Sequence, residues 1–332
     1  MRYTAAVAMR IRQLRCHFDA FEFHRIEPAL LFLQDPRPKN AFFHQDMTVI
    51  RSDKADIVWR HMPWMYFTVE RWVVQSLSSA WCVRQAGVRS MHERFPYKAD
   101  AIRFVPTWVD TAVFSPIDDA RRQVQRRKLA LELSLDIGSV WVVSVGRLDS
   151  QKDPALLLDA VARLAGENTD LNWLVVGDGV LRASLEQQVA SAGIGARVRF
   201  LGLMAPTQIA ELLQVADVFA LSSAYEGMPM AVLEALGSGV PVATTDVGEV
   251  RQVVKPGING EIASERSAQG FAKCLGTVIA RRSYLRGDPA VQAIQAFQPE
   301  QVLAPVFANY RRLAGRQDGT PSAKSARPMS SQ

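Results

Sequence analysis

Tyr225-Glu226-Gly227-Met228-Pro229-Met230-Ala231-Val232-Leu233-Glu234 follows a hydrophobic strand candidate at 217–221 and opens a helix that ends near Gly237 or Gly239. Pro229 suits the first helical turn, since the N–H that it lacks would be unpaired there anyway. Glu226 lies in the loop and Glu234 on the helix, and the steps from one to the other turn through about 800°, close to two whole turns. Both carboxylates can therefore face one ligand.

The start of this helix offers a place for an anion. The backbone N–H groups of Met230 and Ala231 have no helical partner, and the helix dipole adds positive charge at the same end. An acid beside an anion site indicates a ligand that carries hydroxyls as well as phosphate. Two glutamates at this spacing are also common on a solvated helix face, so the neighbouring motifs decide between the two interpretations.

The residues around this stretch alternate regularly between strand and helix patterns. Strand candidates lie at 140–145, 173–176, 198–201, 217–221 and 240–244, and helical patterns lie at 154–164, 180–191, 206–215 and 229–236. Such alternation predicts a parallel, doubly wound sheet. Ligands of these sheets bind at the carboxyl ends of the strands.

Three loops at those strand ends have suitable chemistry. The first strand is followed by Gly146-Arg147-Leu148 and then by Lys152, and the two cations can neutralise a diphosphate. The second strand is followed by the tight turn Gly177-Asp178-Gly179, and the fourth by the 226–234 unit. We expect all three loops to lie along one edge of the sheet.

The first half of the chain carries weaker signals. Short strand candidates at 20–24 and 41–44 each end at a histidine, where a parallel sheet places ligand groups. For each histidine, a packed or surface ring without chemistry is the alternative. No glycine occurs before Gly87, although a nucleotide-binding sheet normally needs a glycine turn after its first strand. This half is therefore predicted to be incomplete as a doubly wound domain.

The composition sets limits on the class of protein. The chain has 332 residues, of which 48% are hydrophobic and 22% charged, and its formal net charge is +6. These values predict a globular protein with room for two cores, and the basic balance suits an anionic ligand or an acidic membrane surface. Nucleic acid is not expected, because no aromatic-basic module of the kind that reads bases occurs. Cys16, Cys82 and Cys274 form no C-x-x-C pair, which favours a reducing cytosol over a disulfide framework or a zinc site.

Two segments bear on a membrane. No apolar run reaches the length of a bilayer span, and we expect no signal peptide. The basic segment at 2–17 fits a surface helix better than a transit peptide. The segment at 57–76 places aromatic residues among basic ones, which is compatible with a peripheral membrane contact. A core helix with a solvated side is the alternative for this second segment.

Six motifs occur in order at the spacing of one known family. They are Val145-Gly146-Arg147-Leu148 with Lys152-Asp153, Val176-Gly177-Asp178-Gly179, Phe200-Leu201-Gly202, Glu226-Gly227-Met228-Pro229 through Glu234-Ala235, Gly239-Val240-Pro241-Val242-Ala243, and Asp246-Val247-Gly248. The ordered set resembles glycosyltransferase family four, which comprises retaining enzymes of the GT-B fold that transfer a sugar from a nucleotide diphosphate sugar. The resemblance covers residues 104–310, and the set is far more specific than any one motif.

The resemblance implies a role for each candidate residue. Arg147 and Lys152 would hold the diphosphate and stabilise the leaving group, and Glu226 would contact the donor sugar near its reacting carbon. Glu234 would bind the ribose hydroxyls, the loop at Leu203 would face the base, and His24 would reach the sugar from the acceptor domain. The implied catalytic residues are His24, Glu226, Arg147 and Lys152, and the implied donor-binding residues are Gly146, Arg147, Lys152, Gly177, Leu203, Glu226, Gly227, Met230, Ala231 and Glu234.

The implied fold class is α/β of the GT-B type, with two Rossmann-like domains facing across a cleft and the N-terminal one incomplete. The expected parts are a partial acceptor-side domain at 1–117, a connecting helix at 118–136, a nucleotide-sugar-binding domain at 137–296, a helix that crosses back to the first domain at 297–314, and a disordered tail at 315–332. The run of charged residues in the connecting helix is best explained by a solvated face. We therefore expect its basic residues on the exposed side of the helix, namely Arg121, Arg122, Arg126, Arg127 and Lys128.

Two features depart from the family pattern. Thr107 and Trp108 stand where many members have Asn-Gly in the turn Pro-Asn-Gly-Val-Asp. The first strands and the glycine loop of the family, which would precede His24, are absent. We therefore expect that the true start lies upstream or that the gene is truncated, which would leave the diphosphate site without one wall.

The implied reaction is sugar transfer to a hydroxyl acceptor with retained anomeric configuration, in polysaccharide or cell-envelope glycan synthesis. The acceptor would be a glycan or a lipid-linked molecule, and the protein would work in the cytoplasm at the inner face of the cell membrane. No D-x-D pair occurs, so we expect no metal, and no cofactor besides the donor substrate.

Two alternatives stay open, a nucleotide-sugar-binding protein without turnover and an inactive truncated fragment. A dinucleotide-dependent oxidoreductase is disfavoured, because Gly177-Asp178-Gly179 continues with Val180-Leu181-Arg182 and lacks the third glycine of G-x-G-x-x-G.

Overall fold

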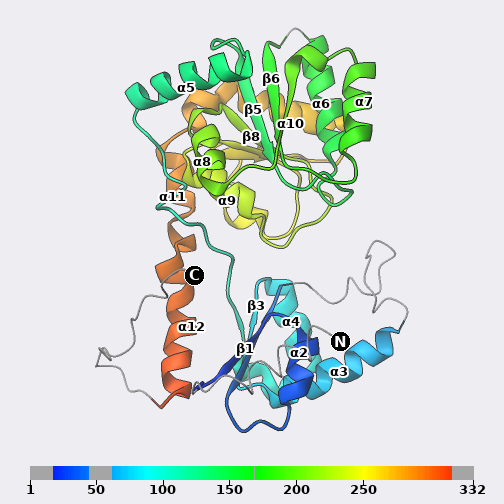
Figure 1. The fold of residues 1–332 in the computed structure, drawn as a ribbon, viewed down its shortest axis with the longest axis vertical. Coiled ribbons are helices and arrows are strands. Elements are labelled where there is room, and N and C mark those ends of the chain that lie inside the picture. Colours follow the sequence, from blue (N-terminus) through cyan, green and yellow to red (C-terminus); the bar gives the residue numbers. More distant parts are fainter. Residues whose placement is uncertain (1–17, 45–61, 168, 316–332) are drawn as a thin grey trace, which may run out of the picture.

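The computed structural model describes residues 18–44, 62–167 and 169–315, and these form two parallel sheets, one in each half of the chain (Figure 1). The helix expected at 2–17, the first part of the aromatic-basic segment and the tail from 316 lie outside the described residues. Each half is an α/β unit, as strand-helix alternation predicts. Among the described helices, none is long and apolar enough to cross a bilayer.

The C-terminal sheet has six strands in the order β10-β9-β8-β5-β6-β7, all paired in parallel. The strands are β5 (Val140–Val145), β6 (Leu171–Val176), β7 (Val198–Gly202), β8 (Val218–Leu221), β9 (Val242–Thr244) and β10 (Gly260–Ile262). The chain builds outward from β5 to β7 and then returns to the other side of β5 for β8. The strand order therefore reverses between β5 and β8, and the carboxyl ends of strands form a ligand crevice at such a point.

Helices cover both faces of this sheet. One face carries α6 (Pro154–Gly166), α7 (Arg182–Ser191) and α10 (Ala268–Leu285), and the other carries α8 (Pro206–Val215), α9 (Met230–Gly237) and α11 (Asp288–Ala293). Side chains alternate along a strand, so Trp141 and Val143 of β5 belong to one core while Val140 and Val142 belong to the other. Burial on both faces explains why the strand reads as a continuous apolar run.

The N-terminal sheet has four parallel strands among the described residues, β1 (Phe21–Phe23), β2 (Lys39–Phe43), β3 (Ser79–Cys82) and β4 (Ile102–Phe104), in sequence order. One face packs on α2 (Ile26–Ala29), α3 (Pro63–Ser76) and α4 (Gln85–Arg94). The other face packs on α12 (Pro299–Leu313), which runs from the C-terminal half along this sheet (Figure 1). Asn309 of α12 donates a hydrogen bond of 2.9 Å to Ser79, so the last described helix is tied to the first sheet.

The charged helix α5 (Asp119–Leu133) packs on α8, and one expectation about it is wrong. Arg126, expected on the solvated side, is buried and donates hydrogen bonds to the carbonyls of Val215 and Ser139, both at 2.7 Å. It also pairs with the Asp217 carboxylate at 2.9 Å, and Arg122, likewise expected on the solvated side, is half-buried and reaches the same carboxylate at 3.2 Å. The acid at the start of β8 neutralises these arginines, whereas Arg121, Arg127 and Lys128 are exposed as expected.

The strand expected at 140–145 and the helix expected at 206–215 are confirmed with their bounds. Other elements shift by two residues or fewer at their starts, and β9 begins at Val242, directly after Pro241, which has no N–H to donate to the ladder. Short 3-10 turns lie at Leu30–Phe32, Pro96–Ala101, Gly195–Arg197, Val250–Gln252 and Gln295–Phe297.

Candidate active site

The loops that follow β5 and β6 lie against each other, beside the point between β5 and β8 where the strand order reverses. The N–H of Gly146 donates to the carbonyl of Val176 at 3.0 Å, and the N–H of Leu148 donates to the carbonyl of Asp178 at 3.0 Å. Gly177 has a φ of +128°, and a Cβ there would lie 1.9 Å from the carbonyl oxygen of Gly146. Only glycine at position 177 permits this approach, which holds the loop of Arg147 over the sheet edge.

The loop between β5 and α6 wraps around the Asp149 side chain. One carboxylate oxygen of Asp149 accepts the N–H groups of Gln151 and Lys152, both at 3.1 Å. The other oxygen pairs with Arg147 at 3.0 Å, and the Arg147 side chain is 71% exposed. Asp149 therefore shapes the turn that places both predicted cations, and it was not singled out from the sequence.

Lys152 and Glu226 form a close, largely buried ion pair. Their atoms Nζ and Oε1 are 2.6 Å apart, and the Glu226 side chain is 8% exposed. The same oxygen of Glu226 accepts a hydrogen bond of 2.8 Å from the Ser223 hydroxyl. The carbon chain of Lys152 lies against Gly146, where a Cβ would be 3.2 Å from Cε. Two residues far apart in the sequence thus meet at the ends of β5 and β8, as predicted for one sheet edge.

Further hydrogen bonds hold the two loops together. The carbonyl of Gln151 accepts the N–H of Ala224 at 2.8 Å, and its side-chain amide donates to the carbonyl of Tyr225 at 3.3 Å. The same side chain accepts a hydrogen bond of 3.1 Å from Arg147. Gln151 has no motif signal in the sequence, because both of its bonds to the Glu226 loop are to backbone groups. A cavity of about 30 Å³ lies beneath, lined by residues that include Gly146, Lys152 and Ser222.

The start of α9 is open toward a ligand. The backbone N–H groups of Met230 and Ala231 have no hydrogen-bond partner among the described residues, and the Met230 side chain is 53% exposed. Gly248 supports the preceding loop from behind, since its φ is +54° and a Cβ there would lie 1.8 Å from the carbonyl oxygen of Gly227. That carbonyl accepts the N–H of Glu249 at 2.8 Å. The helix start is therefore presented on a fixed loop.

The two predicted acids both lie near Lys152. Burial raises the pKa of Glu234, and the positive charge of Lys152 acts in the opposite direction. Lys152 contacts Glu226 directly, so the charge of one lysine acts on both carboxylates. Leu203, expected to face the base, lies on the loop after β7 with 83% of its surface exposed.

At the N-terminal sheet the structure brings together two histidines that were predicted at the ends of separate strands. His24 follows β1 and His44 follows β2, and Nδ1 of His24 lies 2.8 Å from Nε2 of His44 with the rings stacked. Nε2 of His24 lies 2.7 Å from Glu22, which also accepts a hydrogen bond from the Tyr310 hydroxyl of α12. Burial lowers the pKa of His44, as does the nearby His24, while Glu22 opposes this.

These contacts set the tautomers of the histidine pair. An ionised carboxylate can only accept, so Nε2 of His24 carries a proton toward Glu22. When both rings are neutral, Nδ1 of His24 accepts from Nε2 of His44, which leaves Nδ1 of His44 as an acceptor for another group. Within the described ranges, no hydrogen bond or ion pair joins His24 to Lys152 or Glu226.

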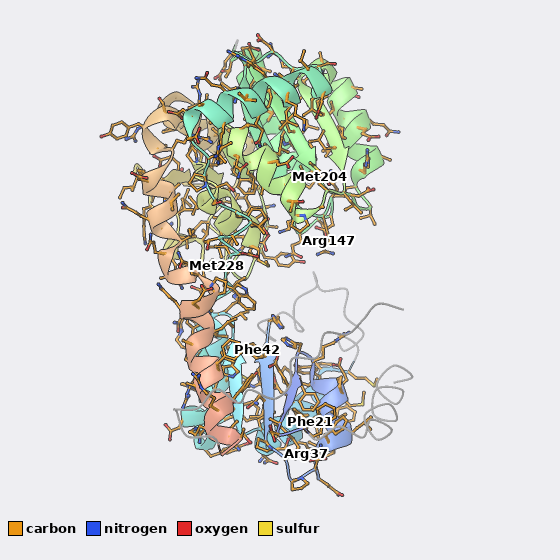
Figure 2. All side chains as sticks on the ribbon, turned by 60° about the vertical axis from the view of Figure 1, so that its left-hand side comes forward. Phe21, Arg37, Phe42, Arg147, Met204 and Met228 are labelled. Atoms are coloured by element: carbon orange, nitrogen blue, oxygen red, sulfur yellow. The ribbon has the colours of Figure 1, made fainter. Side chains whose placement is uncertain are left out.

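The two halves touch beside the Glu226 loop. The N–H of Gln85, at the start of α4, donates to the Glu249 carboxylate at 3.1 Å, and Arg84 lies beside Gly227. Figure 2 shows Arg147 and Met228 on the side of the C-terminal half that faces the N-terminal half, and Phe42 on the facing side of the N-terminal sheet. The strand ends of both sheets thus point toward the space between them.

Sequence comparison matches residues 132–286 to a family model described as glycosyl transferases group 1. The chain is 32% identical over 229 residues to a D-inositol 3-phosphate glycosyltransferase of Geodermatophilus obscurus, covering 66% of this chain and 49% of that protein. It is 29% identical over 268 residues to a 2-deoxystreptamine glucosyltransferase of Streptomyces kanamyceticus, covering 75% of this chain and 64% of that protein. The chain spans about half the length of the first of these relatives.

Solved structures show the same fold. Sucrose-phosphate synthase of Thermosynechococcus elongatus superposes with a TM-score of 0.76 at 21% identity, covering 94% of this chain and 77% of that one. Anabaena HepE in complex with UDP gives a TM-score of 0.73 at 20% identity, covering 93% and 82%. The predicted GT-B fold class, with two Rossmann-like α/β units, is confirmed.

Proposed function

We propose that this chain is a retaining glycosyltransferase of family four that binds a nucleotide diphosphate sugar in the crevice between β5 and β8. The ion pair of Lys152 and Glu226, 2.6 Å apart beside the open start of α9, is the observation that carries this proposal. A diphosphate sugar presents phosphate oxygens next to hydroxyls, and this edge presents a cation and helix N–H groups next to acids. The similarity to glycosyl transferases group 1 covers the same sheet, which supports the proposal.

In the proposed reaction, the bond between the anomeric carbon and the diphosphate oxygen breaks, and the sugar passes through an oxocarbenium-like state. The acceptor hydroxyl attacks on the same face and gives its proton to the departing phosphate oxygen. Negative charge grows on the diphosphate, so Arg147, Lys152 and the N–H groups at the start of α9 would stabilise the transition state more than the bound donor. Once Lys152 contacts phosphate, Glu226 keeps the hydrogen bond from Ser223 and can accept another from a sugar hydroxyl.

The remaining donor contacts follow from position. Glu234 on α9 would accept hydrogen bonds from the ribose hydroxyls, and the exposed loop at Leu203 would lie along the base. In the N-terminal half, His24 and His44 would bind the sugar or the acceptor hydroxyl from the facing sheet edge. Solved neighbours that contain UDP and UDP-glucose support a nucleotide-sugar donor.

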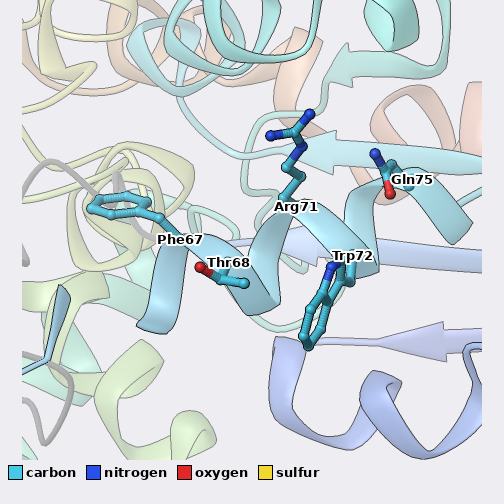
Figure 3. Close-up of a pocket in the computed structure, with 5 residues that line it drawn as sticks. All are labelled: Phe67, Thr68, Arg71, Trp72 and Gln75. Carbon is cyan, nitrogen blue, oxygen red and sulfur yellow. The ribbon is translucent and has the colours of Figure 1, made fainter. Parts of the chain in front are cut away.

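A lipid-linked acceptor would bring the chain to the inner face of the cell membrane from the cytoplasm, and α3 offers a surface for this contact. Trp64 and Trp72 are 69% and 53% exposed, and a shallow hollow of about 500 Å³ is lined by Phe67, Thr68, Arg71, Trp72 and Gln75 (Figure 3). Exposed tryptophans beside a cation suit an anionic lipid surface. We expect the double substitution Trp64→Ala and Trp72→Ala to reduce flotation with anionic liposomes. Tyr284→Ala on α10 is the control and should not reduce it. Flotation that does not depend on anionic lipid would contradict this membrane contact.

Donor turnover tests the proposed function directly. The purified chain is incubated with UDP-, GDP- and ADP-glucose, each with and without a glycan acceptor, and release of the nucleoside diphosphate is measured. Release from at least one donor, lost in Lys152→Ala but kept in Lys128→Ala, is the expected result. Binding of a nucleoside diphosphate without release from any donor would favour a nucleotide-sugar-binding protein without turnover. The absence of both binding and release would contradict the proposed function.

A further inference from the structure

Arg84 occupies the corner where the N-terminal half meets the Glu226 loop. It follows the carboxyl end of β3, which ends at Cys82, and it is the residue that precedes α4. Its backbone is extended, with φ of −133° and ψ of 138°. Arg84 did not enter the predicted site, because no motif marks it.

The side chain of Arg84 lies alongside the loop that carries Glu226. A Cβ placed on Gly227 would lie 3.8 Å from both Cγ and Cδ of Arg84. The next residue, Gln85, donates its N–H to the Glu249 carboxylate at 3.1 Å, and the N–H of Glu249 in turn donates to the carbonyl of Gly227. Two independent contacts therefore hold Arg84 and Gln85, which we call the Arg84 corner, against the loop that leads to α9.

The Arg84 guanidinium is a cation without a partner in the part of the chain that the structure describes. Its Nε is buried and has no acceptor, and no described carboxylate lies within 4.0 Å. The neighbouring acid, Glu249, is engaged by the N–H of Gln85 and by the side-chain amide of Gln252 at 2.7 Å. The two Nη groups also have no described partner, but unlike Nε they are not enclosed, so a ligand anion could bind the guanidinium through them.

The charge balance of the C-terminal edge shows what that ligand would need. Two cations there, Arg147 and Lys152, face three carboxylates, Asp149, Glu226 and Glu234. The cluster is therefore not positive even if the buried Glu234 holds a proton. The start of α9 adds about half a positive charge, which is less than a diphosphate requires. A further cation beside Gly227 would shift the balance toward binding such an anion.

We propose that Arg84 completes the diphosphate site from the N-terminal half, so that the donor's phosphates are held by both halves at once. This inference rests on the proposed function and names a donor contact that lies outside the matched part of the chain. Binding of the diphosphate would then pull the Arg84 corner and the α9 start together. Donor binding and the arrangement of the two halves would be coupled through one arginine.

Calorimetric titration of UDP, GDP and ADP, and of the matching nucleosides, into wild type, Arg84→Gln and Arg84→Lys tests this. For the diphosphate that wild type binds best, Arg84→Gln should raise Kd about 10- to 100-fold, as expected for loss of a charged hydrogen bond. Arg84→Lys should recover part of the loss, and the affinity for the nucleoside should not change. Arg89→Gln removes an exposed arginine from α4, the helix that follows Arg84, and should leave every Kd unchanged.

The other outcomes overturn the inference in distinguishable ways. Equal Kd values for the diphosphate in wild type and Arg84→Gln, with Lys152→Ala weakened, would remove Arg84 from the site and leave the proposed function standing. Equal weakening of diphosphate and nucleoside would show that Arg84 only supports the fold. An increase in the KM of the acceptor with an unchanged diphosphate Kd would assign Arg84 to the acceptor instead. A wild type that binds no diphosphate and consumes no donor would overturn both proposals.

Discussion

The carboxyl ends of the two sheets present different kinds of groups to the space between them. At the ends of β5 and β8, which we call the charged edge, Lys152 forms an ion pair with Glu226, and Asp149 accepts hydrogen bonds from the loop backbone. At β1 and β2, two stacked imidazoles are joined to each other and to Glu22. Fixed charges suit a diphosphate, whereas imidazoles suit hydroxyls near neutral pH. Substitutions at the charged edge should therefore weaken diphosphate binding. Substitutions at the ends of β1 and β2, which we call the imidazole edge, should leave diphosphate binding unchanged.

The largest effect is expected from Lys152→Ala. The substitution removes a cation from the leaving group and leaves Glu226, which is 8% exposed, without its ion-pair partner. Donor turnover at saturating donor should fall about 100- to 1000-fold, as when a preorganised donor to a developing anion is lost. Lys128→Ala on α5 is the matched control, because that lysine is 67% exposed and lies on another surface. Full activity of Lys152→Ala would show that the charged edge is not the donor site.

Gly248→Ala tests whether the charged edge depends on its supporting loop. A Cβ at 248 would meet the carbonyl oxygen of Gly227 at 1.8 Å, and φ is +54°. We expect a loss of about 2–3 kcal/mol in the free energy of unfolding, with weaker diphosphate binding. Gly193→Ala is the control, since φ is +69° there but nothing lies within 4 Å of the added Cβ. Gly193→Ala should lower the free energy of unfolding, measured with urea, only by the cost of a left-handed backbone at alanine, about 1–2 kcal/mol. Equal losses in the two variants would mean that the loops do not need their close approach.

His44→Gln addresses the imidazole edge. Loss of the acceptor nitrogen should lower the rate of transfer to the acceptor hydroxyl about tenfold, as expected for the loss of one hydrogen bond, and leave the Kd of the diphosphate unchanged. His92→Gln is the control, because His92 contacts the carbonyl of Ile102 at the start of β4, the opposite edge of the sheet. If His44→Gln weakened diphosphate binding as much as Lys152→Ala, the division between the two edges would be wrong.

A smaller effect concerns stability at low pH. Burial lowers the pKa of His44 in the folded chain below its usual 6.5, so the unfolded chain takes up the proton first. The free energy of unfolding should fall as the pH drops below 6.5 toward the lower folded value, with His24 adding to the effect and Glu22 opposing it. Urea unfolding near pH 7.5 and near pH 5.5 should show a smaller difference in His44→Gln than in wild type. An equal or larger difference in the variant would contradict the lowered pKa of His44.

No effect is expected from metal removal. Arg147 and Lys152 would neutralise the diphosphate in place of a metal ion. Donor turnover in excess EDTA should equal turnover without it. Activity that EDTA abolishes and manganese restores would require another account of the leaving group.

The sequence predicted the C-terminal sheet well because its strands are buried on both faces and its helices are amphipathic. It missed β10, whose three residues are too few to form a pattern, and β3, whose four residues lie in a segment without a clear period. It placed Lys152 and Glu226 on one edge because parallel strands share their carboxyl ends. The direct contact between them required the structure.

Other parts of the site could not be read from the residues. Asp149 accepts hydrogen bonds from backbone N–H groups, and Gln151 is bonded to the backbone of the Glu226 loop. Any residue type can supply a backbone group, so these bonds leave no pattern in the sequence. Arg126 belongs to a charged run that fits a solvated helix face, yet Asp217 lies far away in the sequence and draws it into the core. A charge pattern on one helix cannot reveal a carboxylate that another strand supplies.

A crystal structure of the chain with the nucleoside diphosphate that it binds best would test the central claim most directly. The diphosphate should lie between the side chains of Arg147 and Lys152 and the N–H groups of Met230 and Ala231, with Glu226 turned toward the place of the sugar. A diphosphate bound anywhere other than the ends of β5 and β8 would contradict the account.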